Sequence, residues 1–574
     1  MLSPLNPSAK SSADFVVCDI ENNPDGTVID IDTCWRNQET KKVEHIRHEN
    51  WAEFWAWVKP KARKHKKFRT IYAHNGGGWD WLSLADELLR ELTTDKDAVS
   101  AVVAGSSMIV LSVRVSKYYT FKLCDSLQLL RSGLDKLGNQ FLNRGKIDTG
   151  GLLPHELKEQ NPDLYFEYLE RDTETLLLVL ESALETLRDN VAKIDNFGIT
   201  IGSTAMKVFR TVGIETPITI PWDDKLKSLL REGYKGGRVE CFIAGVFDRV
   251  YVYDINSLYP SVMRDFRVPI SDRGNWTKKF VKNGVGVYRG RFRQVNRSIP
   301  AVMIDKGLSC YEGEGVFFTP EIDLLFEVDR LASFEVIEGF EFFDVDYIFK
   351  DYVEKLYQLR LDNPDTPLSL LCKFLLNSLY GKFGQNPLRE QLIHVKEFDT
   401  LYDLIRDQAK VQVLDAHRGL FQVSTTSDCA FEHVGIAGTI TSNARVRLYH
   451  GLLEAKNGLL YCDTDSVHCS KPISSRFIGS ELGLFKKEFE GAGAYAGKKL
   501  YALRDGNGQE KIRAKGVSVG GRNGFSLNFN DLCRVVNGET IECEFFKPAT
   551  VRQVWGGQAP CLFKSKKRRI KRTV

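Results

Sequence analysis

The sequence predicts a multidomain protein of mixed α/β and α+β class, and three observations support this prediction. A chain of 574 residues has room for several compact units of roughly 100–200 residues each. A hydrophobic fraction of 43% is ordinary for a globular protein and excludes a collagen-like, low-complexity or disordered chain. Strand and helix patterns alternate over about the first 190 residues, which is typical of an α/β domain, and a second strand-rich region follows.

The predicted elements of the first region can be placed in order. Residues 15–21 form an apolar run and residues 27–31 alternate in polarity, which predicts a strand, a turn and a paired strand. Two strands are expected in residues 98–113, around a turn at Gly105, Ser106 and Ser107. Leucines recur at threes and fours from Asp163 to about Asn190, which predicts a long amphipathic helix.

The second region begins with a predicted strand at residues 246–254. Helical patterns surround residues 350–385 and are broken at residues 363–367, which contain two prolines. Residues 459–469 predict a hairpin with acids at its tip. The remainder is strand-rich and ends in a basic tail, residues 564–572.

Charge and cysteine content narrow the class of protein. Lys and Arg number 79 against 75 Asp and Glu, a net charge of +4 that rests on the basic tail, so net charge alone does not predict a nucleic-acid binder. The 12 cysteines contain no CxxC pair and predict reduced, mostly buried thiols. The chain begins without a signal-peptide pattern, and its longest uncharged run, residues 98–113, is too short to span a bilayer. We therefore expect a cytoplasmic protein without a membrane segment.

Paired acids at predicted strand ends are the first candidate functional residues. Asp19 and Glu21 are two residues apart, so they share one face of a strand, and so can Asp463 and Asp465. Carboxylate oxygens are the ligands that Mg²⁺ prefers, and two such ions can clamp the attacking and leaving oxygens of a phosphoryl transfer. Each pair taken alone is better explained by solvated turn acids or a strand-end cap than by a metal site.

Two further segments favour a functional site over solvated turn acids. Asp254 ends an apolar strand and precedes a turn into a helix, whose backbone amides can face a phosphate. Lys373, Asn377, Tyr380 and Gly381 fall on one face of a predicted helix, where they suit a nucleoside triphosphate. A helix with a merely solvated lysine is the alternative, and it accounts less well for Asn377 and Gly381, which we expect to be buried.

Three strings in this order resemble motifs A, B and C of the family B DNA polymerases: YDINSLYPSVM (253–263), KFLLNSLYGKFG (373–384) and YCDTDS (461–466). Upstream, residues 19–21, 75–80 and 168–172 resemble the three motifs of that family's 3′–5′ exonuclease, with Trp79 where the family usually has Phe or Tyr. The resemblance spans about residues 15–520. It implies an RNase H-like exonuclease domain followed by a right-hand polymerase domain of palm, fingers and thumb.

Shorter strings resemble elements of the protein-primed branch, which includes phage replicases of linear genomes capped by a terminal protein. They are residues 234–237, 441–445 and 499–501, and Ser126-Leu127 with Leu130. Residues 234–237 alone are also consistent with a plain glycine turn.

The resemblance also implies domain boundaries. The exonuclease would occupy residues 1–190 and the polymerase residues 191–574. A first insertion, about 265–350, would dock the priming protein, and a second, about 388–430, would promote strand displacement and processivity. The palm would comprise about 191–264, 351–360 and 431–500, the fingers about 361–387, and the thumb with the tail about 501–574.

In the polymerase site, the resemblance implies that Asp254 with Ile255, and Asp465, hold two Mg²⁺ ions, for which Mn²⁺ can substitute, while Asp463 is an auxiliary acid. Four side chains would bind the incoming nucleotide, one beneath its sugar, one on its phosphates and two around the nascent base pair. They are Tyr259, Lys373, Asn377 and Tyr380, respectively.

In the exonuclease site, four acids would bind two metal ions and Tyr168 would orient the attacking water; the acids are Asp19, Glu21, Asp80 and Asp172. Without the other motifs, Tyr168 and Asp172 would be read as a surface pair one helical turn apart. The residues implied to contact DNA are His74, Asn75, Trp79, Ser126 and Leu127 at the frayed 3′ end, and Tyr234, Gly236, Gly237, Thr441, Arg445, Lys499 and Tyr501 elsewhere.

The implied partners are template-primer DNA, deoxynucleoside triphosphates and a terminal priming protein, and we expect a monomer in the cytoplasm of a phage's host cell. Two alternatives stay open: a family B polymerase that extends ordinary primers, and an inactive relative that only binds DNA. Intact acids at both sites argue against the second. The basic runs at residues 59–67 and 564–572 are consistent with phosphate contacts or with a solvated surface, and the tail also with a targeting signal.

Overall fold

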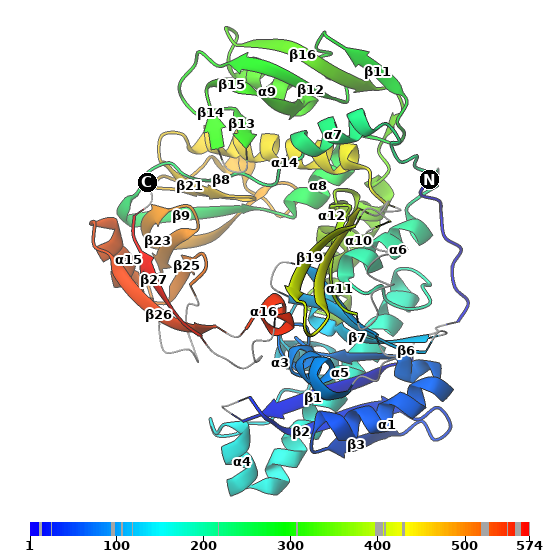
Figure 1. Ribbon diagram of the computed structural model, residues 1–574. Helices are drawn as coiled ribbons and strands as arrows, with labels where there is room; N and C mark the ends of the chain where they lie inside the picture. Colours follow the sequence, from blue (N-terminus) through cyan, green and yellow to red (C-terminus); the bar gives the residue numbers. More distant parts are fainter. Residues whose placement is uncertain are drawn as a thin grey trace.

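The fold is described from a computed structural model, shown in Figure 1. It describes all residues except 11–13, 24–25, 93–97, 105–106, 117–118, 216, 306–307, 396–405, 407–408, 427–430, 518–526, 548, 557–563 and 573–574. The expected turn residues Gly105 and Ser106 therefore lie outside the described residues. In the described part of the chain, no helix is long and apolar enough to cross a membrane.

The N-terminal region is built on a mixed sheet whose central strands are parallel. Strand β1 pairs with β4 in parallel, and β4 pairs with β7 in parallel, while β2 and β3 extend one edge in antiparallel fashion. The two predicted N-terminal strands and their antiparallel pairing are confirmed, whereas Asp25 of the turn between them lies outside the described residues. The strands are β1 Val16–Asn22, β2 Val28–Arg36, β3 Val43–His48, β4 Thr70–Ala73, β5 Ala98–Ala104, β6 Ser107–Ser116 and β7 Tyr119–Asp125.

Helices cover both faces of this sheet. The predicted long helix is confirmed as α5, Pro162–Asn190, which begins after an Asn161 cap and packs its leucine face against β1 and β2. Its Leu176, Leu180 and Leu187 are buried. The other helices are α1 Trp51–Lys64, η1 Lys66–Arg69, α2 Asp80–Glu87, η2 Leu88–Leu92, η3 Ser126–Gln128, α3 Leu134–Leu142 and α4 Pro154–Gln160.

A second, wholly antiparallel sheet forms the centre of the molecule, in the order β25-β24-β23-β9-β22-β21-β8. Helix α14, Val434–Ala455, packs on it together with α8, Leu258–Asp265. The predicted hairpin with acids at its tip is confirmed as β21 and β22. The strands are β8 Val239–Cys241, β9 Gly245–Ile255, β21 Leu459–Asp463, β22 Ser466–Cys469, β23 Phe485–Gly497, β24 Leu500–Arg504 and β25 Glu510–Ala514, with η4 Ser475–Phe477 between β22 and β23.

Residues 268–346 form a separate four-stranded sheet, in the order β11-β16-β12-β15, which stands above α14 in Figure 1. A short pair, β10 Val268–Pro269 with β17 Val345–Asp346, closes its base. The other elements are β11 Gly274–Thr277, β12 Gly286–Arg293, β13 Val302–Asp305, β14 Leu308–Cys310, β15 Glu312–Phe318, α9 Thr319–Val328 and β16 Ser333–Phe342.

Five helices connect these units. The predicted break at residues 363–367 is confirmed, because α10 ends at Asp362 and α11 begins at Pro367 with Thr366 as its cap. The helices are α6 Ile201–Val212, α7 Asp224–Gly233, α10 Lys350–Asp362, α11 Pro367–Ser378 and α12 Tyr380–Phe383.

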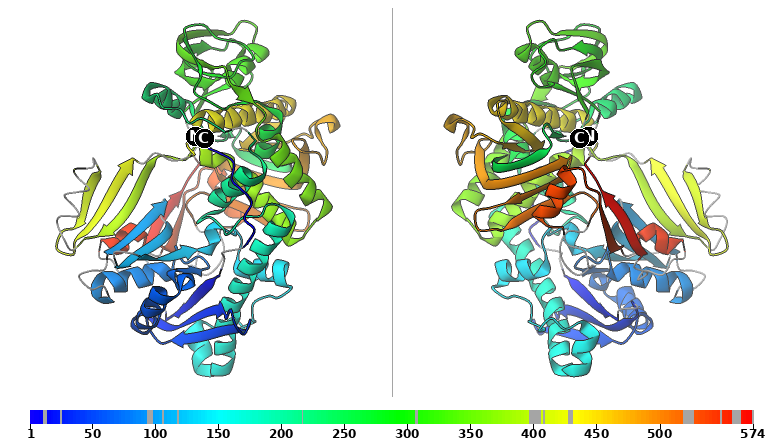
Figure 2. Two further views of the ribbon diagram at one scale, coloured as in Figure 1. Left: turned by 90° about the vertical axis from the view of Figure 1, so that its right-hand side faces the viewer. Right: turned by 90° about the vertical axis from the view of Figure 1, so that its left-hand side faces the viewer.

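A second excursion, which follows α12 in the chain, extends the N-terminal sheet. Strand β18, Leu388–His394, pairs with β5, and with β20 Leu420–Thr426 and β19 Lys410–Asp415 it completes a ten-stranded sheet. Figure 2 shows these yellow-green strands projecting beside the blue strands of the N-terminal region. Residues 388–426 are therefore joined to the first region by backbone hydrogen bonds.

The C-terminal segment links the central sheet to the N-terminal region. Helix α15, Phe529–Val536, packs on β23 and β24, whereas α16, Val551–Trp555, packs on α2, with Trp555 fully buried. Strand β26, Ile541–Lys547, pairs with β27, Lys564–Ile570. The basic tail is thus an ordered strand with a buried Ile570, and it is no loose extension.

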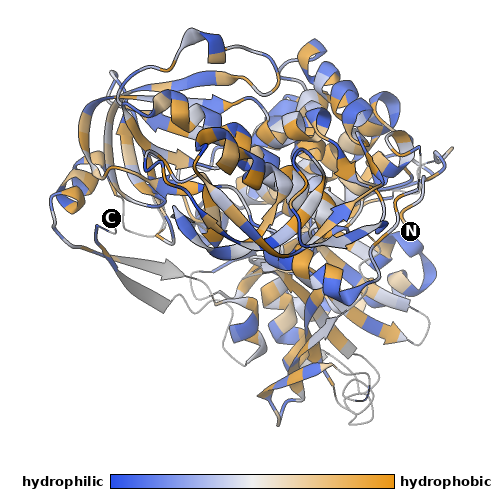
Figure 3. Cartoon of the chain, turned by 90° about the horizontal axis from the view of Figure 1, so that it is seen from above, coloured by the Kyte–Doolittle hydropathy of each residue, from blue (hydrophilic) through white to orange (hydrophobic). Residues whose placement is uncertain are grey.

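Hydrophilic and hydrophobic residues are interspersed along the helices and strands, as Figure 3 shows. One large core runs from α5 through α6, α10 and α11 to α14, so it joins the N-terminal region to the central unit. None of the described cysteines forms a disulfide, and most of them are buried, as predicted.

Candidate active sites

The first candidate site lies where β9, β21 and β22 meet. Asp254, near the end of β9, is paired across the sheet with Ser466, the residue after Asp465. The backbone N–H of Ile255 donates to the carbonyl of Asp465 at 2.8 Å, so the ends of the two strands are held together. Ile255 has a fully buried apolar side chain, so only its main chain could serve a metal. Asp254 and Asp465, 211 residues apart in the chain, therefore share one edge of the sheet.

The carboxyl groups at this edge crowd one another. Burial, followed by the charges of Asp465 and Glu488, raises the pKa of Asp254 to about 7. Burial, with the charges of Asp463 and Glu488, raises the pKa of Asp465 to about 6. Glu488, on β23, was missed in the sequence because no local pattern ties it to the other acids. The excess of negative charge is the kind that a divalent cation neutralises.

Asp463 faces differently from the other two acids. Its Oδ1 lies 3.1 Å from the Nζ of Lys499, and its Oδ2 accepts a hydrogen bond from Tyr461 at 3.4 Å. The backbone N–H of Lys499 also donates to the Tyr461 hydroxyl at 3.1 Å. Lys499 thus fixes Asp463, and this pairing fits the auxiliary role that the sequence suggested better than a metal-ligand role.

The turn that carries these acids is supported by residues 234–238. Thr464, at the tip, has a positive φ of 63°, and its N–H donates to the carbonyl of Arg238 at 2.7 Å. A Cβ on Gly237 would lie 2.7 Å from the Thr464 side chain, so only glycine allows this approach. Gly237 therefore lets the backbone of this loop pack directly beneath the acidic turn.

Arg445 holds this loop from behind. It is 5% exposed, and it donates to the carbonyl oxygens of Lys235 and Gly236 at 2.8 and 2.9 Å. Its other guanidinium edge pairs with the equally buried Glu321 of α9, at 3.1 and 2.9 Å. The sequence predicted that Arg445 contacts DNA, and the structure corrects this, because a buried and fully engaged guanidinium is not available to a phosphate.

Two other predicted DNA contacts are corrected for the same reason. Thr441 is 2% exposed, and its hydroxyl donates to the carbonyl of Gly438 within α14. Tyr501 is 6% exposed and packs against Tyr461 with 5.0 Å between the ring centroids. Both residues had been placed by motif resemblance, which says nothing about the direction of a side chain.

The predicted nucleotide-binding residues line up beside the acids. Tyr259, on α8, stacks on Tyr380, on α12, with 4.4 Å between the ring centroids and 21° between the planes. Lys373, Asn377 and Gly381 share one face, and all three are exposed. The expectation that Asn377 and Gly381 are buried was wrong, because the opposite face of α11, with Leu371 and Leu375, is the one that packs into the core.

The second candidate site lies between β1, α2 and α5. Asp19 and Glu21 share a face of β1, and α5, which packs over that face, carries Tyr168 and Asp172. Asp80, the first residue of α2, is 4% exposed and Asp172 is 2% exposed. The charges of Asp80, Glu21 and Asp172 all act on Asp19, so the four predicted acids are brought together.

Burial and mutual repulsion dominate the electrostatics of this second site. Burial, followed by the charges of the other three acids, raises the pKa of Asp19 far above its usual value. Burial raises the pKa of Asp80 to about 7. Lys146, from the loop between α3 and α4, forms an ion pair with Asp172 and is the nearby positive charge. Burial opposes that charge, but the pull of Asp172, Asp19 and Glu21 is stronger and raises the pKa of Lys146.

Lys146 was missed in the sequence, because it lies in a loop 26 residues before its partner, where no periodicity connects the two. Its Nζ lies 5.5 Å from the centre of the Tyr168 ring. Burial, followed by the charges of Glu21, Asp172 and Asp19, raises the pKa of Tyr168. The hydroxyl of Tyr168 is therefore held among the acids.

The residues expected at the 3′ end flank this second site. The His74 ring lies 3.0 Å from the Ser126 hydroxyl, which donates to the carbonyl of Ala73. Asn75 is exposed with a positive φ of 64°, while Trp79 and Leu127 are half-buried. Asp125, a residue that the sequence did not single out, accepts from the N–H of Leu127 at 2.9 Å and ties these loops together.

The carboxylate oxygens at both sites are suitable ligands for Mg²⁺ or Mn²⁺, although the side chains are not in coordination geometry. Among the described residues, no three His, Cys, Asp and Glu side chains stand in ligand geometry. At the second site, however, Asp172 Oδ1 is a buried carboxylate oxygen without a hydrogen-bond partner, and Lys146 takes the position of a counter-charge on Oδ2. A hard cation would satisfy the first oxygen and offset the crowded acids.

Comparison with known proteins agrees with this geometry. Residues 156–430 match the family described as DNA polymerase type B, organellar and viral. The DNA-directed DNA polymerase of Enterobacteria phage PRD1 is 27% identical over 465 residues, which is 78% of this chain and 76% of that one. The chain is thus similar to the type B DNA polymerases that its motifs resemble. A probable DNA polymerase of the fungus Agaricus bitorquis is 25% identical to this chain over 568 residues, covering 83% of this chain and 69% of that one.

A solved structure extends the likeness in fold to nearly the whole chain. Phi29 DNA polymerase complexed with primer-template DNA and incoming nucleotide substrates has a TM-score of 0.73 to it. Sequence identity is 17%, and the likeness covers 98% of this chain and 100% of that one. This shared fold confirms the mixed α/β multidomain class predicted from the sequence.

Proposed function

We propose that this protein is a type B polymerase that replicates DNA by two-metal nucleotidyl transfer, proofreads with a 3′–5′ exonuclease, and starts synthesis on a terminal protein while displacing the opposite strand. The observation that carries the proposal is the shared sheet edge at which Asp254 and Asp465 crowd each other and Glu488. We assign the exonuclease to residues 1–190 and the polymerase to residues 191–574.

Asp254, the main chain of Ile255 and Asp465 would hold the two Mg²⁺ or Mn²⁺ ions at the polymerase site. When bound, these ions acidify the primer hydroxyl and neutralise the leaving pyrophosphate. Asp463 stays paired with Lys499 and keeps the acidic turn in place. Gly237 and Arg238 support the same turn from below, so the acids are positioned before substrate arrives.

The tyrosine stack would select deoxyribonucleotides. Tyr259 lies flat against Tyr380, so its ring is fixed and cannot move aside for a 2′-hydroxyl on the incoming sugar. Lys373 and Asn377, exposed on the neighbouring face, would meet the triphosphate and the nascent pair. Gly381 has no atom within 4 Å of where a Cβ would be, so the backbone there is open to a ligand.

In the exonuclease site, Asp19, Glu21, Asp80 and Asp172 would hold two metal ions that activate water and stabilise the leaving 3′ oxygen. Tyr168, held among the acids, would orient the attacking water. His74, Asn75, Trp79, Ser126 and Leu127 would grip the frayed 3′ end, Trp79 by stacking on a base.

The two excursions would serve the partners of replication. Residues 268–346 form a sheet of their own that stands off from the central unit, a geometry that suits docking of a priming protein. The β18–β20 strands are tied to α16 by an ion pair between Glu390 and Arg552, and we assign strand displacement and processivity to this excursion. Template-primer DNA and deoxynucleoside triphosphates are the substrates.

Two variants test the two catalytic sites separately. Asp465→Asn should abolish nucleotide addition while the protein still degrades single-stranded DNA. Asp19→Ala combined with Glu21→Ala should stop that degradation while extension continues. Extension by the first variant, or parental degradation by the second, would refute the corresponding assignment.

Protein priming needs a different assay. Incubation with the protein encoded beside the polymerase gene and a radioactive deoxynucleotide should label that protein covalently, and the label should need Asp465. Extension of DNA primers without any such labelling would favour a polymerase that uses ordinary primers.

A further inference from the structure

A second row of buried acids, on β2, lies beside the exonuclease acids of β1. In the β1–β2 pairing, Asp19 stands opposite Asp32 and Glu21 stands opposite Asp30. Directly opposite residues of an antiparallel pair present their side chains on the same face, where like charges destabilise the sheet. Asp32 is fully buried and Asp30 is 5% exposed, so each needs a compensating partner.

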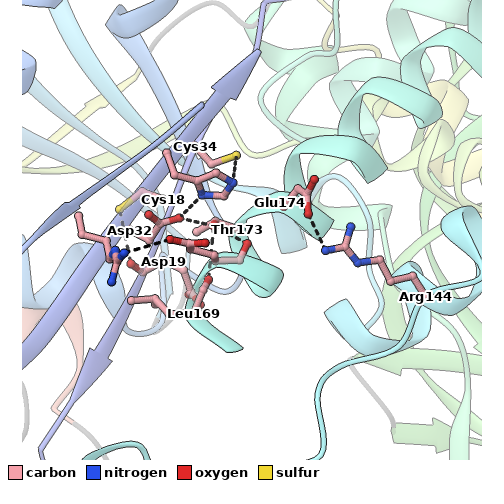
Figure 4. A network of polar contacts seen from close by, with 11 residues as sticks. Cys18, Asp19, Asp32, Cys34, Arg144, Leu169, Thr173 and Glu174 are labelled. Carbon is pink, nitrogen blue, oxygen red and sulfur yellow. Dashed lines mark hydrogen bonds and ion pairs between the residues drawn. The ribbon is translucent and has the colours of Figure 1, made fainter. Parts of the chain in front are cut away.

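Each acid of this second row has a partner. Lys158 lies 2.5 Å from Asp30. Asp32 Oδ2 accepts from the hydroxyl of Thr173, on α5, and lies 2.8 Å from His45 Nδ1, on β3. Figure 4 shows Asp32 between β2 and α5, with Thr173 directed at it from the helix. One carboxylate oxygen therefore joins β2, β3 and α5.

The position of Thr173 gives this contact its importance. It is the residue next to Asp172, the exonuclease acid, and it lies five residues after Tyr168 on the same helix. Its hydroxyl also lies 3.0 Å from the carbonyl of Glu170, which is the intrahelical partner that it would keep if Asp32 were lost. The bond to Asp32 thus ties the helix to the sheet at the turn that carries the catalytic acid.

We propose that Asp32, His45 and Thr173 form a positioning triad that fixes Asp172 and Tyr168 over the acids of β1. This inference rests on the exonuclease proposed above. None of the three residues touches DNA or metal in this scheme. They act by setting the distance between α5 and the sheet, and a metal site is sensitive to that distance.

The role of His45 is electrostatic as well as geometric. Its ring faces Asp32 and Cys34 on β2 and the carboxylates of Glu170 and Glu174 on α5, with Cys34 Sγ 3.7 Å from Nε2. A protonated imidazole there offsets the buried charge of Asp32 and the acids of the helix. Loss of the proton leaves the hydrogen bond possible but removes that compensation.

The first test uses matched changes on α5. Thr173→Val keeps the shape and removes the hydroxyl, so we expect single-stranded DNA degradation to fall about 10- to 100-fold, the usual effect of losing a contact that orients a metal ligand. Extension by the same preparation should be unchanged, which controls for folding. Thr173→Ser should restore degradation. Thr175→Val, which alters a buried threonine beside Gly138, should have no effect.

The second test separates electrostatic positioning from plain packing. The ratio of parental to His45→Gln degradation rates should fall toward one as the pH rises through the range where His45 loses its proton. A ratio that is flat with pH, or a Thr173→Val variant as active as the parent, would overturn the proposal.

A third measurement does not depend on catalysis. In EDTA, deuterium exchange of peptides covering residues 169–176 should be faster in Thr173→Val than in Thr173→Ser, and equal exchange would also overturn the triad. If the parent enzyme degrades no DNA at all, the exonuclease proposal fails, and the exchange result still decides whether the triad fixes α5.

Discussion

The buried pair between Arg445 and Glu321 offers the sharpest test of how the first insertion is joined to the polymerase site. Glu321→Gln keeps the shape of the side chain but removes its charge. Arg445 is 5% exposed and Glu321 is 2% exposed, and Lys235, only 4% exposed, also feels the charge of Glu321. The substitution therefore leaves two buried cations with one compensating charge fewer.

The expected magnitude follows from this burial. Removing one partner of a buried ion pair costs about 3–5 kcal/mol, whereas an exposed pair is worth about 0–1 kcal/mol. Burial lowers the pKa of Lys235 to about 8, so this lysine can lose its proton and relieve part of the strain. We therefore expect Glu321→Gln to lower the free energy of unfolding by about 3 kcal/mol at neutral pH. The loss of stability should be larger at pH 6.5 than at pH 8.5, because Lys235 stays protonated at pH 6.5 and its charge remains uncompensated.

The assay is urea denaturation at the two pH values, with Glu314→Gln as the matched control. Glu314 pairs with Arg291 at 2.9 Å, but both side chains are about half-exposed. Extension should also slow in Glu321→Gln, since Arg445 holds the loop beneath Thr464, while degradation of single-stranded DNA should not change. Equal stabilities of the two variants, or the opposite dependence on pH, would refute this reasoning.

Four further predictions concern other parts of the molecule. Gly77→Ala should destroy exonuclease activity and spare extension, because its Cβ would lie 1.9 Å from the carbonyl of Met108; parental degradation would contradict this. Gly381→Ala should leave the melting temperature unchanged or raise it, because alanine favours a helix over glycine by up to about 1 kcal/mol of free energy. The same variant should raise the KM for nucleotides, and an unchanged KM would argue against the open backbone as a binding surface. Mg²⁺ should raise the melting temperature more at pH 8 than at pH 5.5, because Asp254, with a pKa raised to about 7, is protonated in the folded state at the lower pH and becomes an uncompensated charge above it; equal shifts would contradict metal binding there. Deleting residues 564–574 should lower the melting temperature as well as processivity in moderate salt, since β26 loses its partner strand, and unchanged product length would leave the tail a structural element only.

The parts of the fold that the sequence predicted are those set by short-range patterns. Strand β1 with β2, helix α5, the break before Pro367 and the hairpin with Asp463 and Asp465 all follow from periodicity, caps and turn residues within a few positions. The acids of both sites other than Glu488 were found for the same reason, because each lies in a compact motif.

The parts that the sequence did not predict depend on pairings across long stretches of chain. Nothing local shows that β18 joins β5, or that Glu488 faces Asp254. Motif resemblance placed Arg445 at DNA, but the tertiary fold gives its guanidinium to Glu321 instead. A motif records which residue is kept at a position, whereas burial decides what the side chain can reach.

The ion pair between Arg552 and Glu390 has a kinetic consequence. Together with Gln422, 3.2 Å from Arg552, it closes a circuit that runs from the central sheet through α15 and α16 to β18 and back through α12 and α14. A strand threaded through a closed circuit cannot leave sideways; it escapes only past a free end or when the contact opens. The lifetime of the complex on a long template would then be set by the opening rate of one polar junction, and much less by the total number of phosphate contacts.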